Sequence, residues 1–292
     1  MPEPDRYGVM ARRLLAAAAL FVVIGIQREA PAATYSWSGL GLDGFWDSGA
    51  NWIGGVPPDY SLLPTTLQFS GTARTTAVNR TPSPLVAFID FANDNSDGRT
   101  GAFTLSGSAV RLDPQSRITT AALVNSGTIT DTIALPLIMQ GGLTVALGGS
   151  AQAVHNLTIA GGVSGSGTLS STGSFGTLTL SGSNTYSGST WVRGGTLLVP
   201  AGGALTGGSQ IRVGVAPGEN AAFRVDGGLV VSSTASIASG EPNVGTATVS
   251  SGTWINTGWF DVGRTGTGTL NIVGTGVVTV GGGTGTLMLA PL

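Results

Sequence analysis

Three similar segments recur near the end of the sequence, at a spacing that limits the possible folds. The interval from Val225 to Val249 is nearly the same as the interval from Val249 to Ile272, and an apolar pair follows each residue at the same offset. A repeat of about 20 to 50 residues is typical of solenoids, propellers and arrays, but a propeller blade needs about 40. The leucine and asparagine spacing of a leucine-rich repeat is absent. The spacing therefore predicts one coil of a parallel β-helix per repeat.

Short runs of alternating apolar and small polar residues fill most of the chain after residue 33. Residues 143–147, 177–180 and 269–272 are examples. A period of two places one set of side chains inside and the other in water, as in a β-strand. The chain also has 48 glycines in 292 residues, and each glycine inside a helix costs roughly 1 kcal/mol relative to alanine. The prediction is an all-β fold in which inward Val, Ile and Leu stack from coil to coil.

Residues 1–33 have the pattern of an export signal. Arg12 and Arg13 precede a small and apolar run at 14–26, and small residues follow at 30–33. The length of the run suits a cleavable signal peptide and is short for a bilayer-spanning helix. We expect cleavage before Thr34. A membrane anchor or a buried core helix is the alternative, and the arginine pair leaves the twin-arginine route open.

The composition excludes several kinds of function. The chain has no cysteine, and all 13 basic residues are arginine, so lysine-dependent chemistry is excluded. The formal net charge is −2 and no basic run exists. Nucleic acid and anionic membranes are therefore not expected as partners, and no cofactor is expected. Without disulfides, an exported fold must be held by packing and backbone pairing.

One segment resembles a known family. Residues 176–197 read GTLTLSGSNTYSGSTWVRGGTL and resemble the autotransporter-associated β-strand repeat, of the form GTLTLSGxNTYxGxTxVxxGTL. The segment departs from the usual residues mainly at Trp191 and Arg193. The order Asn-Thr-Tyr at 184–186 is not dictated by strand periodicity, which makes the resemblance specific.

Two other regions resemble parts of the same proteins. Gly-Thr-Trp at 252–254 and Gly-Thr-Leu-Asn-Ile at 268–272 are similar to a second repeat. Near the expected mature N-terminus, the spacing of Trp37, Trp46, Trp52 and Pro57 is similar to the start of many such proteins. Together these stretches cover about half of the expected mature chain.

The resemblance implies a right-handed parallel β-helix, secreted or displayed at a bacterial surface or outer membrane, with no catalytic residues. The expected organisation is a signal peptide at 1–33, an N-terminal capping region at 34–95 and a β-helix at 96–292. The helix includes the family repeat at 176–198 and, at 221–280, the repeats that have the spacing of Val225, Val249 and Ile272. The family usually ends in a membrane barrel or a sorting tail. Because residues 285–292 read as a strand, we expect a fragment or truncated relative lacking that barrel or anchor.

Three candidate catalytic or cofactor features have simpler interpretations. His155 is the only histidine, so it cannot form a multi-histidine metal site, and we expect it at a turn or on the surface. Ser48, in Asp-Ser-Gly, lacks the flanking glycines of a serine nucleophile turn. Residues 39–44 fit G-x-G-x-x-G, but the residues after them cannot form the helix that a dinucleotide site requires. No catalytic or cofactor-binding residue is predicted.

A calcium site is the one metal candidate. Asn93, Asn95 and Asp97, followed by Gly98, have the spacing that begins a calcium loop. The bidentate glutamate expected later in such a loop is replaced by Thr104. The alternative, which we favour, is a polar turn between two strands.

An aromatic group marks the start of the mature chain. Tyr35, Trp37, Trp46 and Trp52 could form a platform on which sugars stack, or could cap the first coil of a solenoid. We predict the cap.

Two functions remain in view. The first is a structural or adhesive exoprotein that contacts a surface or matrix ligand, either glycan or protein, and that self-associates through an open C-terminal coil. The alternative is a polysaccharide-active β-helix enzyme, a lyase or glycoside hydrolase, or a carbohydrate-binding exoprotein. Such enzymes cluster their acids, whereas Asp226, Glu241 and Asp261 stand singly in the repeats. The prediction is a protein that is not an enzyme.

Overall fold

Parallel β-strands make up almost all of the folded chain. The computed structural model describes residues 33–62, 64–92, 101–123, 126–215, 218, 220–281 and 287–289. Within these ranges there are 27 strands in three sheets and one short 3-10 helix, η1 (Gly49–Asn51). The all-β prediction is confirmed. Residues 1–32 of the expected signal peptide lie outside the described ranges.

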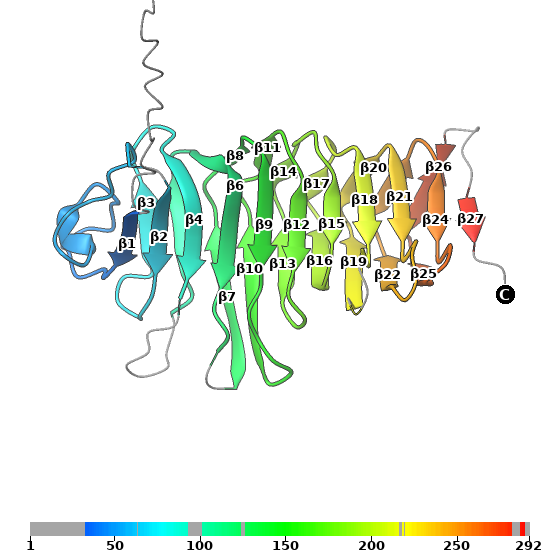
Figure 1. Ribbon diagram of the computed structural model, residues 1–292, viewed down its shortest axis with the longest axis horizontal. Coiled ribbons are helices and arrows are strands. Elements are labelled where there is room, and N and C mark those ends of the chain that lie inside the picture. The colour runs from blue at the N-terminus through cyan, green and yellow to red at the C-terminus, as the bar shows by residue number, and fades with distance from the viewer. Residues whose placement is uncertain are drawn as a thin grey trace, which may run out of the picture. The chain divides into compact units, whose positions relative to one another are not determined.

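The strands of the three sheets follow one another along a stack of coils (Figure 1). The thirteen-stranded sheet consists in order of β1 (Ala33–Trp37), β2 (Thr65–Phe69), β4 (Leu85–Phe91), β6 (Val110–Thr120), β9 (Gly142–Ala146), β12 (Leu169–Thr172), β15 (Thr190–Val192), β18 (Gln210–Val213), β21 (Thr234–Ile237), β24 (Phe260–Val262) and β27 (Leu287–Leu289), with β8 (Leu137–Met139) beside β6 and β11 (Val163–Gly165) beside β8. The nine-stranded sheet consists of β3 (Thr76–Asn79), β5 (Thr104–Gly107), β7 (Gly127–Ile133), β10 (Ala153–Ile159), β13 (Thr177–Leu180), β16 (Gly195–Pro200), β19 (Asn220–Asp226), β22 (Val244–Val249) and β25 (Thr267–Ile272). The five-stranded sheet consists of β14 (Ser183–Asn184), β17 (Ala204–Leu205), β20 (Leu229–Ser232), β23 (Thr253–Asn256) and β26 (Val277–Val280).

Neighbours within a sheet are usually three strands apart in the sequence, as in β12, β15, β18, β21 and β24. The chain therefore visits the three sheets in turn and returns to pair in parallel with its previous pass. This arrangement is a parallel β-solenoid, in which each coil hydrogen-bonds only to the coils before and after it.

The predicted repeat spacing matches the strand register. Val225 pairs with Val249, and Val249 with Ile272, so one coil separates each pair of segments. Earlier in the same sheet, Thr179 pairs with Leu198, which pairs with Arg224. Thr179 and Arg224 thus lie two coils apart in one register.

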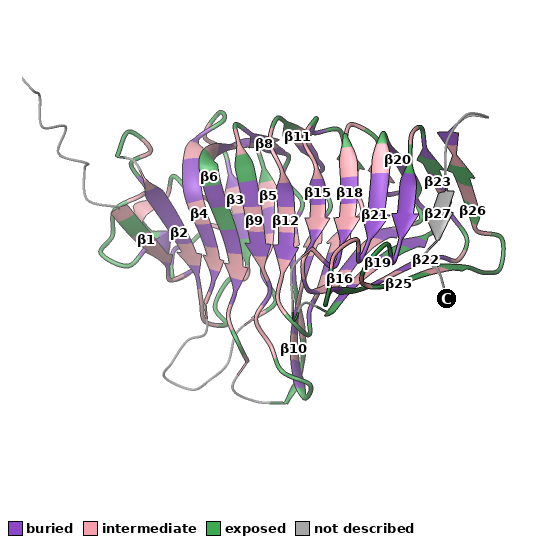
Figure 2. Ribbon diagram, turned by 45° about the vertical axis from the view of Figure 1, so that its right-hand side comes forward, coloured by how far each residue is buried: buried purple, intermediate pink, exposed green. Residues whose placement is uncertain are grey.

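Alternating burial forms the core. Strand β10 shows strict alternation of buried and half-buried residues, and Figure 2 shows the same alternating bands on most strands. The inward positions are mainly Leu, Ile, Val and Phe, and they form one continuous apolar cluster from Trp37 to Val262. Burying such a side chain stabilises the fold by about 1.5–3 kcal/mol, so the stack is held by repeated apolar ladders.

The parallel sheet begins inside the region expected to form an N-terminal cap. Strands β1, β2 and β4 lie between residues 33 and 91 and pair in order in the thirteen-stranded sheet. The non-repetitive segment between β1 and β2 contains η1 and packs Trp46 and Trp52 against Phe69 of β2.

Candidate functional site

Side chains on the outer face of the thirteen-stranded sheet line up in rows because the strands pair in register. One row runs through five partly or fully exposed residues on successive strands from β6 to β18: Arg117, Thr144, Ser170, Trp191 and Arg212. Neighbouring strands lie about 4.8 Å apart. A row of this kind therefore offers a line of hydrogen-bonding groups, charges and one aromatic ring to a ligand.

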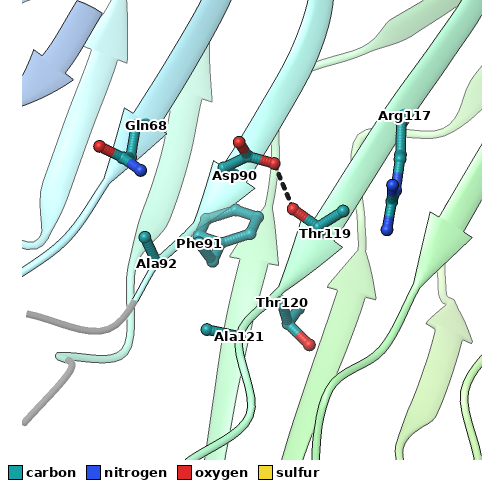
Figure 3. Close-up of a pocket in the computed structure, with 8 residues that line it drawn as sticks. All are labelled: Gln68, Asp90, Phe91, Ala92, Arg117, Thr119, Thr120 and Ala121. Atoms are coloured by element: carbon teal, nitrogen blue, oxygen red, sulfur yellow. Dashed lines mark hydrogen bonds between the residues drawn. The ribbon is translucent and has the colours of Figure 1, made fainter. Parts of the chain in front are cut away.

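A hollow of about 350 Å³ opens beside the first residue of this row. Its lining consists of Gln68, Asp90, Phe91, Ala92, Arg117, Thr119, Thr120 and Ala121. Figure 3 shows Gln68, Asp90 and Thr119 side by side, from β2, β4 and β6, and the Thr119 hydroxyl donates a hydrogen bond to the Asp90 carboxylate. The described lining thus combines one carboxylate and one guanidinium with hydroxyl and amide groups. Such groups suit a polar ligand.

Two acids of the repeats, Asp226 and Asp261, lie on different sheets. Asp226 lies on β19 of the nine-stranded sheet and Asp261 on β24 of the thirteen-stranded sheet. Hydrogen bonds from the Ser250 and Ser251 hydroxyls, each 2.9 Å from Oδ1, hold the pKa of Asp226 below its ordinary value. A general acid needs a raised pKa, whereas the pKa of Asp226 is lowered.

His155 is buried, and the expectation of a turn or surface position is wrong. It lies in the middle of β10 with 1% of its surface exposed. Its Nδ1 is 2.9 Å from the Ala121 carbonyl oxygen, and its Nε2 is 2.6 Å from Asp131 Oδ2. Asp131, fully buried on β7, also accepts a hydrogen bond from the backbone N–H of Phe103 at 2.8 Å.

The chemistry of this pair follows from its partners. A carbonyl oxygen only accepts, so Nδ1 is the donor to Ala121, and the other ring nitrogen, Nε2, forms the hydrogen bond with the Asp131 carboxyl group. The direct cross-strand partner of Asp131 is Leu157. His155 occupies the inward position of β10 immediately before Leu157. A polar residue at an inward position, one coil after an inward acid, is the sequence signal that identifies such a pair.

The surroundings of Asn184 explain why the family pattern has an asparagine at this position. It is fully buried on β14. Its side-chain oxygen accepts a hydrogen bond from Val163 N at 3.1 Å, and its amide donates to the carbonyls of Gly182 at 2.9 Å and Ala204 at 3.0 Å. One side chain therefore ties its own coil to the coil before and the coil after it.

Tyr186 and Gly188 have equally specific surroundings. The buried Tyr186 hydroxyl is 2.6 Å from Thr190 Oγ1, and burial raises the pKa of the phenol although this hydrogen bond opposes the effect. A Cβ on Gly188 would lie 1.8 Å from the carbonyl oxygen of Gly167. The repeat residues thus have structural roles.

The second repeat has its own buried polar group. Trp254 Nε1 donates to Ser232 Oγ at 3.0 Å, and Ser232 Oγ donates to Asn256 Oδ1 at 2.8 Å. The Asn256 amide in turn donates to the carbonyls of Gly258 and Trp259, both at 2.9 Å. The tryptophan of the Gly-Thr-Trp motif is therefore a core residue.

The N-terminal tryptophans are interior residues. Trp37, Trp46 and Trp52 are at most 2% exposed, and the rings of Trp37 and Trp52 meet edge to face at 5.1 Å. All three rings lie about 6 Å from the ring of Phe69. Rings buried to this extent offer no face to a sugar, so they do not form the sugar-stacking platform.

The G-x-G-x-x-G match at 39–44 and the Asp-Ser-Gly motif around Ser48 lie in one hydrogen-bonded loop. Asp43, from the G-x-G-x-x-G match, accepts hydrogen bonds from Phe45 N, Ser48 Oγ and Asn51 Nδ2 at 2.9–3.0 Å. Ser48 is thus paired with an acid, and Asp47 forms an exposed ion pair with Arg80 at 2.9 Å. The motif residues organise the loop between β1 and β2.

The calcium candidates Asn93, Asn95 and Asp97 lie outside the described residues. Across the ranges that the structure describes, no group of three or more His, Cys, Asp or Glu side chains gathers as a metal site.

Comparison with known proteins identifies the repeat. The family model of the passenger-associated-transport-repeat matches residues 172–199, which run from the end of β12 through β16. This match, set in a β-solenoid, fits an autotransporter passenger-like repeat protein. The passenger-type segment lies in register within the solenoid, since β13 pairs with β10 before it and β16 with β19 after it.

No curated protein and no solved structure matches the chain. In the part of the chain that the structure describes, no helix is long and apolar enough to cross a membrane.

Proposed function

We propose that this passenger-like protein is exported and acts outside the cytoplasm as a structural or adhesive β-solenoid, without catalysis of its own. The observation that carries the proposal is the transport-repeat match at 172–199 within a continuous parallel stack. The signal-like residues 1–33 support export.

The physical properties of a solenoid suit this role. Each coil adds one strand to each wall, so a long, regular surface is built without disulfides. Outward side chains do not pack in the core, so their identity can change without disturbing it. A row of outward residues such as the one from Arg117 to Arg212 can therefore be adapted to contact a ligand. Self-association through the last described coil is a second proposed contact.

Export is tested by locating the protein in the cell. A peptide tag inserted between Gly54 and Gly55 suits this purpose, because both residues are exposed and a Cβ at either would meet no atom within 4 Å. We expect the tag in the extracellular or cell-surface fraction, accessible to added protease, and a mature N-terminus at Thr34. A matched variant lacking residues 14–26 is expected to stay in the cytoplasm. Retention of the tagged chain with residues 1–33 still attached would contradict export.

The non-catalytic part of the proposal is tested with polysaccharides. Uronic-acid and neutral polysaccharides are incubated with the purified protein, and new chain ends are measured. Turnover that disappears on Asp90→Asn, Asp226→Ala or Asp261→Ala would favour the enzyme.

A further inference from the structure

A row of polar side chains on the outer face of the thirteen-stranded sheet leads into the hollow of about 350 Å³. Ser36 on β1 pairs with Gln68 on β2, Gln68 with Asp90 on β4, and Asp90 with Thr119 on β6. All four are half-buried, and the last three line the hollow (Figure 3). Because neighbouring strands lie about 4.8 Å apart, the row presents hydrogen-bonding groups at a regular interval along the coil axis.

Two hydrogen bonds within this row orient its amide and carboxylate groups. Ser36 Oγ donates to Gln68 Oε1 at 2.9 Å, and the Thr119 hydroxyl donates to Asp90 Oδ1. Among the described residues, the Gln68 amide nitrogen and Asp90 Oδ2 have no hydrogen-bond partner, and neither atom is buried. The row therefore holds an N–H donor and a charged acceptor ready for a ligand, and groups that are already held in place lose less conformational entropy on binding.

A second outward row lies two residues earlier on the same strands and adds an aromatic ring and a cation. Phe88 on β4 pairs with Arg117 on β6. Phe88 precedes Asp90, and Arg117 precedes Thr119, by two positions, so both project from the same face as the polar row. Arg117 is exposed and lines the hollow, and Phe88 is half-buried. An aromatic ring beside polar groups offers an apolar surface to the C–H groups of a sugar ring.

The charges of the lining favour an uncharged ligand. The lining contains one carboxylate, from Asp90, and one guanidinium, from Arg117, so its formal charges cancel. A polyanion would be repelled by Asp90 and a polycation by Arg117. A sugar hydroxyl both donates and accepts, so sugar hydroxyls can pair with Asp90 Oδ2 and with the Gln68 amide. The volume of the hollow also lies within the range of about 300–1,000 Å³ that is usual for ligand pockets.

The direction of the two rows favours a polymer over a single sugar. In an extended polysaccharide, one sugar follows the next at nearly the interval between neighbouring strands, which is about 4.8 Å. A polysaccharide lying along the coil axis therefore brings successive sugars to Gln68, Asp90 and Thr119.

We propose that this hollow binds a neutral polysaccharide, with Asp90 and Gln68 hydrogen-bonding its hydroxyl groups and Phe88 packing against a sugar ring. The ligand class deepens the adhesive function proposed above and rests on it. The site binds without cleaving, because Asp90 is the one acid among the described residues of the lining, whereas glycoside hydrolysis uses two carboxyl groups.

The test titrates the purified protein with cellohexaose, mannohexaose and maltohexaose, and with polygalacturonate as the anionic comparison, by calorimetry at low and high salt. We expect at least one neutral hexasaccharide to bind with little dependence on salt, and polygalacturonate to bind more weakly or not at all. Asp90→Ala should weaken the binding by about ten-fold or more, because it removes a charged acceptor, and Gln68→Ala by about three-fold or more. Asp90→Asn keeps the acceptor for Thr119 and should still weaken the binding.

Two variants serve as matched controls. Asp226→Ala removes an exposed acid that also accepts hydrogen bonds from hydroxyl groups, but on the nine-stranded sheet. Gln210→Ala removes a half-buried glutamine on β18 of the thirteen-stranded sheet, several coils from the hollow. Neither should change the affinity. Circular dichroism and melting curves confirm that all variants fold.

Three results would overturn the site. They are failure of every neutral hexasaccharide to bind, preferential binding of polygalacturonate, and folded Asp90 and Gln68 variants that bind as tightly as the parent. Glycan binding by a protein that fails to reach the cell surface would refute the proposed function and leave the site standing. A surface-located protein that binds no neutral hexasaccharide would refute the site and leave export standing.

Discussion

His155 Nε2 lies 2.6 Å from Asp131 Oδ2 inside the wall of the solenoid, and each side chain is 1% exposed. The two residues lie on adjacent strands, β10 and β7, so their hydrogen bonds join neighbouring coils. Ala121 and Phe103 complete the network through their backbones. A buried polar network is stable only when every member has its partner.

We expect His155→Leu to lower the free energy of unfolding by about 3–5 kcal/mol, because it leaves the Asp131 carboxylate buried without its main partner. The double variant His155→Leu/Asp131→Leu should lose less than the single variant, since no orphaned charge remains. Urea unfolding measures both. Thr158→Ala, at a half-buried outward position of β10, is the control and should change stability by no more than about 0.5 kcal/mol. Equal losses in the single and double variants would contradict this account.

Asn184→Ala should destabilise the protein by about 1–3 kcal/mol, because it leaves the Val163 N–H and the Ala204 carbonyl without their partner. Asn184→Asp keeps the shape but removes both amide donors, so it should be no better. Thr185 is the exposed neighbour, and Thr185→Ala should be nearly neutral. Thermal unfolding followed by circular dichroism makes the comparison, and a neutral Asn184→Ala would show that the asparagine is not a structural link.

The sequence predicted the wall of the solenoid better than its interior polar groups. The spacing of Val225, Val249 and Ile272 is set by the length of chain in a coil, so it can be read from one sequence and matches the register. The position of His155 could not be read in the same way. Its burial depends on which coil it joins, and the coil from Asp131 to Leu157 is longer than the coils that join Val225, Val249 and Ile272.

The candidate ligand surface was also hidden from sequence reasoning. In the sequence, Trp191 and Arg193 are only departures from the usual repeat residues. Arg212 joins them because β15 pairs with β18 across a coil that is shorter than the coils joining Val225, Val249 and Ile272. Which outward residues align in a row can be predicted only when the number of residues in every coil is known.

Gly188→Ala should destabilise the protein by about 1–3 kcal/mol, because its Cβ would lie 1.8 Å from the carbonyl oxygen of Gly167, and backbone must move to make room. Gly142→Ala is the matched control on another coil, where the nearest atom to a Cβ is 3.8 Å away. We expect that variant to be neutral or slightly stabilised. Equal urea midpoints for the two variants would contradict the close-approach argument.

Asp43 gives the N-terminal loop a dependence on acid. The backbone N–H of Phe45, aided by Ser48 and Asn51 and partly opposed by desolvation, holds the pKa of Asp43 below its ordinary value. The fold therefore favours the ionised form. This stabilisation is fully present above the ordinary pKa of about 3.9 and is lost as the pH falls through the lowered folded value. Asp43→Asn should be less stable than the parent at neutral pH and should approach it in acid. Unfolding midpoints measured from neutral pH downwards test this, and a difference that does not change with pH would refute it.

The last described coil carries apolar side chains that the preceding coils bury. Ile272 pairs with the buried Val249 but is itself 50% exposed, and Val278 pairs with the fully buried Trp254 but is only partly buried. Among the described residues, β25 and β26 are the last strands of their sheets. An edge of this kind offers unpaired N–H and C=O groups above an apolar surface, to which another chain can add.

We therefore expect residues 34–292, expressed alone, to associate end to end as the concentration rises, with a second copy covering this coil. Ile272→Glu should suppress the association, because it places a charge in the contact that would have to be desolvated. Ile255→Glu is the control, since Ile255 is an exposed apolar residue on the outer face of β23, in a preceding coil, and is 37% exposed. Sedimentation velocity over a range of concentrations distinguishes the variants, and hydrogen exchange reports protection at residues 270–280. A parent protein that stays monomeric at every concentration, with these residues as protected as the central coils, would refute the association. If the parent associates and Ile255→Glu, rather than Ile272→Glu, abolishes the association, the contact lies on the side of the stack and not at its end.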